Sequence, residues 1–217
     1  HQAPFAQVVL ARDGTPLRAF PDRAHIWRHP VRMEEVSPRY VEAVIAYEDR
    51  WFLWHPGVNP FALLRAAGQW IKHGHIVSGG STLTMQVVRM LEPMPYASRT
   101  LAGKLRQVAR AVQLELRLSK REILELYLAY APMGGVLEGV EAASRAYLGK
   151  PSLSLSHAEA ALLAVLPQSP SRLRPDRHPQ RAREARDKVL QRLDSIWGRG
   201  VASDARQEPV IAQTVRE

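Results

Sequence analysis

The spacing of hydrophobic residues predicts a mainly helical chain. After residue 34, apolar side chains recur every three or four positions, which is the period of one face of an α-helix. Proline, glycine and capping residues divide this pattern into separate helices. The predicted helices span residues 38–50, 60–72, 82–91, 98–118, 123–130, 136–148, 160–166 and 180–197. In the helix over 98–118, the apolar residues at 101, 105, 108, 112 and 116 are predicted to form the buried face.

The two ends of the chain depart from the helical pattern. Residues 8–17 surround Asp13-Gly14, which predicts two short strands joined by a tight turn. Residues 198–217 are polar and aperiodic, which predicts a linker or disordered tail. The expected fold class is therefore mainly α with a short β element at the N-terminus. The expected segments are a β-containing segment over 1–34, a helical domain over 35–197 and the tail over 198–217.

Glu48 is the most unusual position in the helical pattern. It ends an apolar stripe that begins at Val41, so a carboxylate takes a place where an aliphatic residue is expected. Partial burial disfavours the charged form, and a helix orients the side chain, which suits a general base or acid. Asp49 lies about 100° further round the helix, so the two acids are expected to have separate roles. The alternative is a core helix that simply ends in a solvated carboxylate.

Composition and charge limit the classes of protein that fit this chain. Its 217 residues, 46% of them hydrophobic, suffice for one sizeable core or two closely packed lobes. The absence of cysteine excludes disulfides, thiolate nucleophiles and cysteine metal sites. The net charge of +9 predicts an anionic partner, which is nucleic acid, acidic lipid or a phosphorylated substrate. A basic composition inherited from a GC-rich genome explains the same charge without any partner.

A second candidate region is the glycine turn that feeds a hydroxyl-rich helix start over residues 79–86. The N-terminus of a helix offers unpaired N–H groups and a positive dipole end, which together suit a phosphate or pyrophosphate. Most such sequences are only helix caps, and the spacing from glycine to lysine of a P-loop is missing here.

Several motifs occur together in a fixed order. They are Glu48-Asp49-Arg50 with Phe52, His55 and Gly57; Gly79 to Gln86; Ser119 to Leu128; Gly139, Ala142 and Ala143; Tyr147 to Lys150; Leu155; Glu159 to Ala161; and Leu166 to Pro170. Over roughly residues 8–195 the sequence resembles the peptidoglycan glycosyltransferases (glycosyltransferase family 51), and among them the 1C type of class A penicillin-binding proteins.

This resemblance implies a lysozyme-like, two-lobed helical glycosyltransferase fold for residues 35–197. The implied reaction is the polymerisation of lipid II at the periplasmic face of the inner membrane. Glu48 would be the base that deprotonates the 4-hydroxyl of the acceptor GlcNAc, while undecaprenyl pyrophosphate leaves the donor MurNAc with inversion. The implied partners are lipid II, the nascent glycan strand and the membrane surface, with no nucleic acid. A fused C-terminal transpeptidase domain, absent from this sequence, is expected after the tail.

The resemblance also implies which residues bind substrate. They are Asp49, Arg50, Phe52, His55, Ser81, Thr82, Thr84, Gln86, Arg89 and Lys104. Among the basic residues near the motifs, Arg89 and Lys104 align with family lysines, whereas Arg99, Arg106 and Arg110 are expected to be solvated or to face a membrane. A divalent cation, Mg²⁺ or Mn²⁺, would enter through Asp49 or the pyrophosphate, and no organic cofactor is expected.

Three positions depart from the pattern of the family. Met85 replaces a second glutamine, Ala129 replaces an asparagine, and Gln107 replaces a glutamate that the family assigns to the leaving-group or substrate-orienting side. Gln107, at this second catalytic position, can form hydrogen bonds but cannot transfer a proton. Catalysis is therefore expected to be weaker or differently assisted here. Compensation by Glu115, two helical turns further on, is one alternative, and pairing of Glu115 with surface arginines four residues away is the expected role.

Tryptophans, leucines and basic residues over 51–76 suit an interfacial helix, although burial of the same leucines in an ordinary core fits nearly as well. His73-Gly74-His75 has no further ligand cluster in the sequence, so a metal site there is not expected.

Two alternative functions remain open from the sequence. A lysozyme-like peptidoglycan hydrolase would use Glu48 as a general acid, although that function suits a polar cleft better than a cationic helix. A basic helical nucleic-acid-binding module would use the +9 charge, with salt-sensitive binding that does not depend on Glu48.

Overall fold

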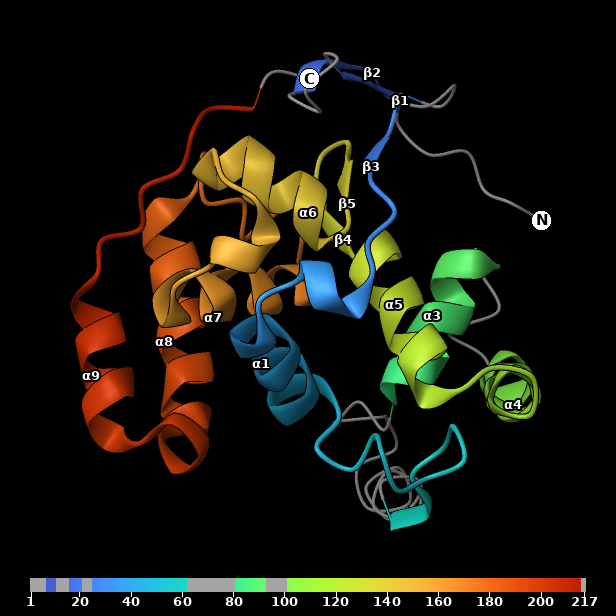
Figure 1. Ribbon diagram of the computed structural model, residues 1–217. Coiled ribbons are helices and arrows are strands. Elements are labelled where there is room, and N and C mark those ends of the chain that lie inside the picture. The colour runs from blue at the N-terminus through green and yellow to red at the C-terminus, as the bar shows by residue number, and fades with distance from the viewer. Residues whose placement is uncertain (1–6, 11–15, 21–24, 62–80, 93–100, 216–217) are drawn as a thin grey trace. The chain divides into compact units, whose positions relative to one another are not determined.

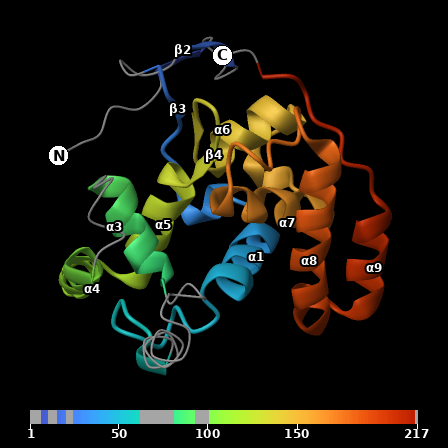
Figure 2. The ribbon, with the colours of Figure 1, turned by 180° about the vertical axis from the view of Figure 1, so that it is seen from behind.

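A computed structural model describes residues 7–10, 16–20, 25–61, 81–92 and 101–215. The described part of the chain is mainly helical, which confirms the predicted fold class (Figures 1 and 2). The chain divides into two compact units. The first unit comprises residues 1–47 and 128–217, and the second unit comprises residues 48–127.

Three packed helices form much of the first unit. They are α7 (His157–Val165), α8 (Pro179–Trp197) and α9 (Arg199–Gln207), which lie side by side in both ribbon views (Figures 1 and 2). α7 begins with a capping box, in which Ser156 and Glu159 each accept a hydrogen bond from the backbone of the other. α8 matches the predicted charged helix, and a 3₁₀ helix over Leu166–Gln168 follows α7.

The prediction of a linker or disordered tail over 198–217 is wrong for residues 199–207, which form α9. α9 buries Ala202 and Ala205, which are three residues apart and therefore share one helix face. The Arg186 guanidinium, 1% exposed, donates to the carbonyl of Arg206 in the last turn of α9 at 2.9 Å and to that of Glu208 just after it at 2.6 Å. A face made of alanines has too little hydrophobicity to stand out in the sequence.

The first unit also contains the described strands. β1 (Gln7–Leu10) and β2 (Pro16–Phe20) pair in antiparallel fashion, as predicted, whereas the Asp13-Gly14 turn lies outside the described residues. A second sheet has the order β3-β5-β4, with bounds Trp27–Arg28, Leu137–Glu138 and Pro132–Gly134. β3 runs parallel to β5 and pairs Trp27 with Leu137.

The predicted helix over 136–148 is wrong in its first part. The chain forms β5, then a short α6 (Val140–Ala143) and a π-helix (Ser144–Leu148). Gly139 separates strand from helix with a φ of 82°, and a Cβ there would lie 2.5 Å from the carbonyl oxygen of Ala129. Glycine is required at such a position because it has no side chain to clash.

α1 (Pro38–Glu48) begins at Pro38, as predicted, and short 3₁₀ helices over Met33–Glu35 and Ser152–Ser154 belong to the same unit. The buried residues of α1 are Tyr40, Ala43 and Val44. The helix ends at Glu48, where the second unit begins.

The second unit contains α3 (Leu83–Leu91), α4 (Leu101–Glu115) and most of α5 (Lys120–Tyr130), and α3 packs against α4. Residues 62–72 of the predicted second helix and 98–100 of the predicted fourth lie outside the described residues. The predicted buried face of this helix is confirmed for Val108 and Val112, which pack against a core cluster containing Met85 and Val88, but it is wrong for Leu105 and Leu116, which are 61% and 82% exposed. Gln107 and Ala111, four residues apart, are buried instead.

Candidate active site

Glu48 and Gln86 form a direct pair. Glu48 is half-buried at the end of α1, and its Oε2 atom accepts a 2.8 Å hydrogen bond from Nε2 of Gln86 on the first turn of α3. A hydrogen bond to a carboxylate is stronger than one between neutral groups, so it holds the acid in one orientation. Gln86 therefore sets the direction in which Glu48 meets a substrate.

Asp49 belongs to a different set of hydrogen bonds. Its carboxylate is buried and contacts Nε2 of His55 at 2.9 and 3.0 Å. It also accepts a 2.9 Å hydrogen bond from the backbone N–H of Leu83, the first residue of α3. A carboxylate there is favoured because the helix N-terminus carries partial positive charge. The two neighbouring acids thus have separate surroundings, as the sequence predicted.

The residues present do not fit a divalent cation at Asp49. Both carboxylate oxygens are engaged by His55, and one of them also by Leu83. Within the described ranges, no group of three or more histidine, aspartate, glutamate or cysteine residues is arranged to hold a metal ion. The suggested His73-Gly74-His75 pair lies outside those ranges.

The Thr82 hydroxyl at the start of α3 forms hydrogen bonds within the protein itself. Thr82 caps the helix by accepting from the N–H of Met85, and its hydroxyl donates to the carbonyl of Gly57 at 2.6 Å. Gly57 has a φ of +85°, and a Cβ there would lie 2.8 Å from the carbonyl oxygen of Ala111. The loop after Asp49 is therefore clamped between α3 and α4. Gly79 and Gly80 lie outside the described residues.

Glu115 connects three segments of the second unit, which the sequence analysis did not predict. Its Oε1 accepts hydrogen bonds from the Thr84 hydroxyl at 2.6 Å and from Nζ of Lys120 at 2.7 Å. Lys120 also donates to the carbonyl of His55 at 2.6 Å and lies 4.6 Å from the centroid of the Phe52 ring. The predicted pairing of Glu115 with surface arginines is wrong. Its spacing of four residues from the buried Ala111 was the available signal.

Two cations converge on Ser81. Lys104 Nζ donates to the Ser81 hydroxyl oxygen at 2.8 Å, and Arg89 Nη1 donates to the same atom at 3.2 Å. Neither cation forms a salt bridge with a carboxylate in the described part of the second unit. Two positive charges that share a neutral hydroxyl form a site for an anion.

Electrostatic coupling joins this cation pair to Glu48. Burial lowers the pKa of Arg89, while the negative charge of Glu48 opposes that shift. Burial also lowers the pKa of Lys104, and the positive charge of Arg89 lowers it further. An anion bound against the pair would relieve both effects, because it compensates the buried positive charge.

Several predicted substrate ligands have supporting positions instead. Phe52 and Thr84 are fully buried, and His55 and Thr82 are 6% and 2% exposed. These four side chains present little surface to a substrate in this structure. Gln107 is 2% exposed, and no described residue pairs with its Oε1 atom. The predicted roles of these residues toward substrate stay predictions.

Arg50 lies apart from these clusters. It is exposed, and its guanidinium carbon is 5.9 Å from the centroid of the Trp51 ring. Arg106 and Arg110 are exposed on α4, as predicted, and Arg99 lies outside the described residues. The residues that the structure groups with Glu48 or the cation pair are Ser81, Gln86, Arg89 and Lys104.

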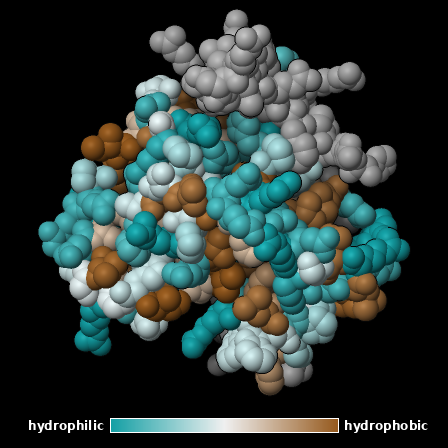
Figure 3. Space-filling view, in the orientation of Figure 1, coloured by the Kyte–Doolittle hydropathy of each residue, from teal (hydrophilic) through white to brown (hydrophobic). Residues whose placement is uncertain are grey.

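Large apolar side chains are exposed on the loop that follows Asp49. Trp51 is 56% exposed, Leu53 61%, Trp54 82% and Phe61 80%. On the face drawn in Figure 3, hydrophobic residues occur in small groups among hydrophilic ones. No helix in the described ranges has the length and apolarity needed to span a bilayer.

Comparisons with known proteins identify the family of the chain. The family model described as Transglycosylase matches residues 13–194. Penicillin-binding protein 1C of Escherichia coli K12 is 59% identical over 212 residues, which are 97% of this chain and 27% of that protein. Penicillin-binding protein 1A of Pseudomonas aeruginosa is 38% identical over 185 residues, 85% of this chain and 22% of that protein. The chain thus spans about a quarter of the length of these relatives.

A solved structure shows the same fold. The crystal structure of penicillin-binding protein 1A from Haemophilus influenzae covers 98% of this chain, which in turn covers 22% of that chain. The TM-score is 0.56 at 22% sequence identity.

Proposed function

Because this chain belongs to the transglycosylase family, we propose that it is a peptidoglycan glycosyltransferase domain that polymerises lipid II into glycan strands. The observation that carries the proposal is the arrangement around Glu48. Gln86 orients its carboxylate, and the half-buried cation Arg89 is electrostatically coupled to it. A base beside an anion site is what displacement of a pyrophosphate requires.

Glu48 acts as the general base in the proposed reaction. It takes the proton from the 4-hydroxyl of the acceptor GlcNAc, and that oxygen forms a bond to the anomeric carbon of the donor MurNAc. The bond to undecaprenyl pyrophosphate breaks with its electron pair, and the configuration at the anomeric carbon inverts. A carboxylate fixed by a hydrogen bond suits proton transfer, since the acceptor hydroxyl must approach within hydrogen-bonding distance.

Arg89 and Lys104 receive the leaving group. Negative charge develops on the pyrophosphate as its bond to the sugar breaks, and two cations fixed on Ser81 stabilise that charge without reorganising. Asp49, His55, Thr82 and Thr84 hold α3 and the loop in place, and they contact no substrate in this proposal.

The same proposal includes a location for the domain at a membrane surface. The exposed Trp51, Leu53, Trp54 and Phe61 suit the interface of a membrane, where aromatic and aliphatic side chains insert among lipid headgroups. We place the domain at the periplasmic face of the inner membrane, where its partners are lipid II and the nascent strand. A transpeptidase domain fused after this chain is part of the same proposal.

Incubation with labelled lipid II in detergent tests the proposed function. Glycan strands support the transferase, whereas fragments released from preformed glycan would indicate a lysozyme-like hydrolase. Inactivity on both substrates together with salt-sensitive DNA binding would indicate a nucleic-acid-binding module. A form of the protein extended at both ends serves as the comparison, so that inactivity of this chain alone is recognised.

The first prediction concerns Gln86. Replacing it with leucine, Gln86→Leu, is expected to lower kcat for glycan synthesis by about tenfold, because Glu48 loses a charge-assisted hydrogen bond. The initial rate of lipid II consumption measures the effect. Gln113→Leu is the matched control, since Gln113 is exposed on α4. Equal rates for the two variants would contradict the orienting role of Gln86.

The second prediction concerns Glu115. Glu115→Ala is expected to lower the free energy of unfolding by about 3 kcal/mol, because Lys120 then lies partly buried without its carboxylate and Thr84 loses its acceptor. Urea denaturation measures the change. Glu125→Ala, which removes a helix-surface pair with Arg121, is expected to cost less than about 1 kcal/mol. A similar loss in both variants would show that Glu115 does not hold the segments together.

A further inference from the structure

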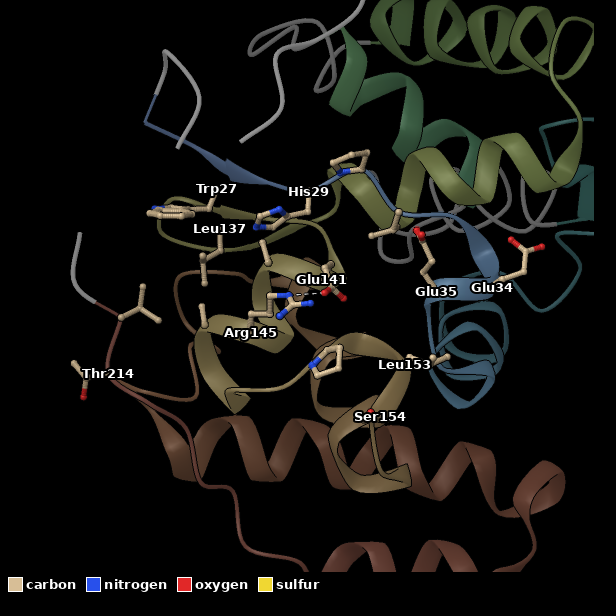
Figure 4. A pocket seen from close by; sticks show the side chains of 16 residues that line it. Trp27, His29, Glu34, Glu35, Leu137, Glu141, Arg145, Leu153, Ser154 and Thr214 are labelled. Atoms are coloured by element: carbon tan, nitrogen blue, oxygen red, sulfur yellow. Dashed lines mark hydrogen bonds and ion pairs between the residues drawn. The ribbon is translucent and has the colours of Figure 1, made fainter. Parts of the chain in front are cut away.

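A cavity of about 830 Å³ lies in the first unit, and none of its lining residues belongs to the second unit, which holds Glu48. Trp27 and His29 project into it from β3 and the residue after it, and Trp27 is paired in register with Leu137 of β5 (Figure 4). Residues two apart on an extended strand face the same side, which explains why both line the cavity. The volume falls within the range of small-molecule sites in proteins.

The cavity has an apolar end and an acidic end. Trp27 and Leu137 lie at one end, and Glu34 and Glu35 lie at the other (Figure 4). Pro30, Val31, Pro151 and Leu153 add apolar lining. Such a division suits a ligand with an apolar body and one polar group.

The middle of the cavity is held by a fixed ion pair. Arg145, on the π-helix, donates to Glu141 at 2.6 Å, and the other oxygen of Glu141 accepts from the backbone N–H of Ser152 at 2.9 Å. A π-helix is rare and is frequently found at functional sites. The Arg145 charge is thus compensated inside the lining and is not available to attract an anion.

The net charge of the residues that line the cavity is opposite in sign to the net charge of the whole chain. Three carboxylates and one guanidinium line it, in a protein whose net charge is +9. Burial lowers the pKa of His29, an effect that Glu141 opposes and Arg145 reinforces, so the imidazole remains neutral at neutral pH. The lining therefore carries an excess of negative charge and attracts a cation.

We infer that this cavity binds an organic cation, an ammonium or guanidinium group attached to an apolar body. The apolar part lies against Trp27 and Leu137, and the cationic part lies toward Glu34 and Glu35. The same chemistry is offered by a basic side chain within an apolar peptide and by a small aromatic amine. The inference does not depend on the proposed glycosyltransferase activity, because the lining contains none of the residues assigned to that reaction.

Trp27 is a built-in reporter of occupancy. The chain has five tryptophans, and the variant Trp27→Phe identifies the Trp27 indole signal in a ¹H–¹⁵N correlation spectrum by its disappearance. Titration with phenethylamine is expected to shift that signal in a saturable manner. Phenethyl alcohol, which has the same ring without the charge, is expected to bind about tenfold more weakly, and the anion hydrocinnamate more weakly still.

Charge reversal at the acidic end provides the test within the protein. Glu34→Lys is expected to weaken phenethylamine binding by about tenfold, whereas Glu184→Lys, the same change at an exposed site on α8, is expected to leave it unchanged. Titration with acetyl-Leu-Arg-Leu-amide distinguishes the two sources: tighter binding of the peptide assigns the site to a basic peptide segment, and tighter binding of phenethylamine assigns it to a small amine. An unmoved Trp27 signal, equal binding of hydrocinnamate, or equal effects of the two charge reversals would overturn the inference.

Discussion

Replacing Glu48 with glutamine is expected to lower the rate of glycan synthesis by roughly 100- to 10,000-fold, which is the usual contribution of a general base. Glutamine keeps the shape of the side chain and a hydrogen bond to Gln86, but its amide cannot accept the proton of the acceptor hydroxyl. The initial rate of lipid II polymerisation measures the loss. Because Glu48 is only half-buried, the variant is expected to fold normally.

Glu42→Gln is the matched control for this experiment. Glu42 lies on the same helix as Glu48 and is exposed, where its carboxylate accepts from the Trp197 indole at 2.7 Å. A glutamine can still accept that hydrogen bond, so the rate is expected to remain that of the wild type. If Glu48→Gln retained more than about a tenth of the wild-type rate, another group would have to be the base.

Removal of either cation at Ser81 is expected to have the next largest effect. Arg89→Ala and Lys104→Ala should each lower kcat by about 100-fold, because each deletes a fixed positive charge that stabilises the departing pyrophosphate. Steady-state kinetics with lipid II measures kcat and KM separately. Weaker inhibition by added undecaprenyl pyrophosphate is expected in the same variants, since the product occupies the same anion site.

Arg106→Ala is the control for the cation pair. Arg106 lies two residues from Lys104 on α4, but it is exposed and therefore contributes charge without a fixed position. Its removal is expected to leave kcat unchanged, because exposed charges are screened by water and salt. The anion site would be assigned wrongly if Arg106→Ala and Lys104→Ala reduced kcat to the same extent.

Most of the fold was predictable because helices are indicated by the spacing of their hydrophobic residues and by capping residues at their ends. The helix start at Pro38, the capping box at Ser156 and the capped helix at Thr82 all match local signals. The errors arose where tertiary contacts override the pattern. Leu105 of α4 and Leu116 just after it are exposed, because Gln107, Ala111 and the neighbouring valines form the buried side of this helix instead.

The site was predictable only in part. The position of Glu48 in an apolar stripe and the family motifs pointed to Glu48, Gln86 and the cation pair, and the structure shows the contacts of Glu48 with Gln86 and of both cations with Ser81. The motifs could not separate residues that face a substrate from those that support the loop, since burial of Thr84 and His55 depends on how α3, α4 and the loop pack. Glu115 was missed because its partners lie 5 and 31 residues away in the sequence.

The contacts of the buried Arg186 determine where the C-terminal boundary of a recombinant fragment can be placed. Its guanidinium is satisfied by carbonyls of Arg206 and Glu208, beyond the last predicted helix. A recombinant fragment that stops at Trp197 would remove both carbonyl acceptors and leave the guanidinium with its ion pair to Asp187 at 2.8 Å, at a cost of about 2 kcal/mol for each lost charge-assisted hydrogen bond. Expression vectors for this domain should therefore extend past residue 208.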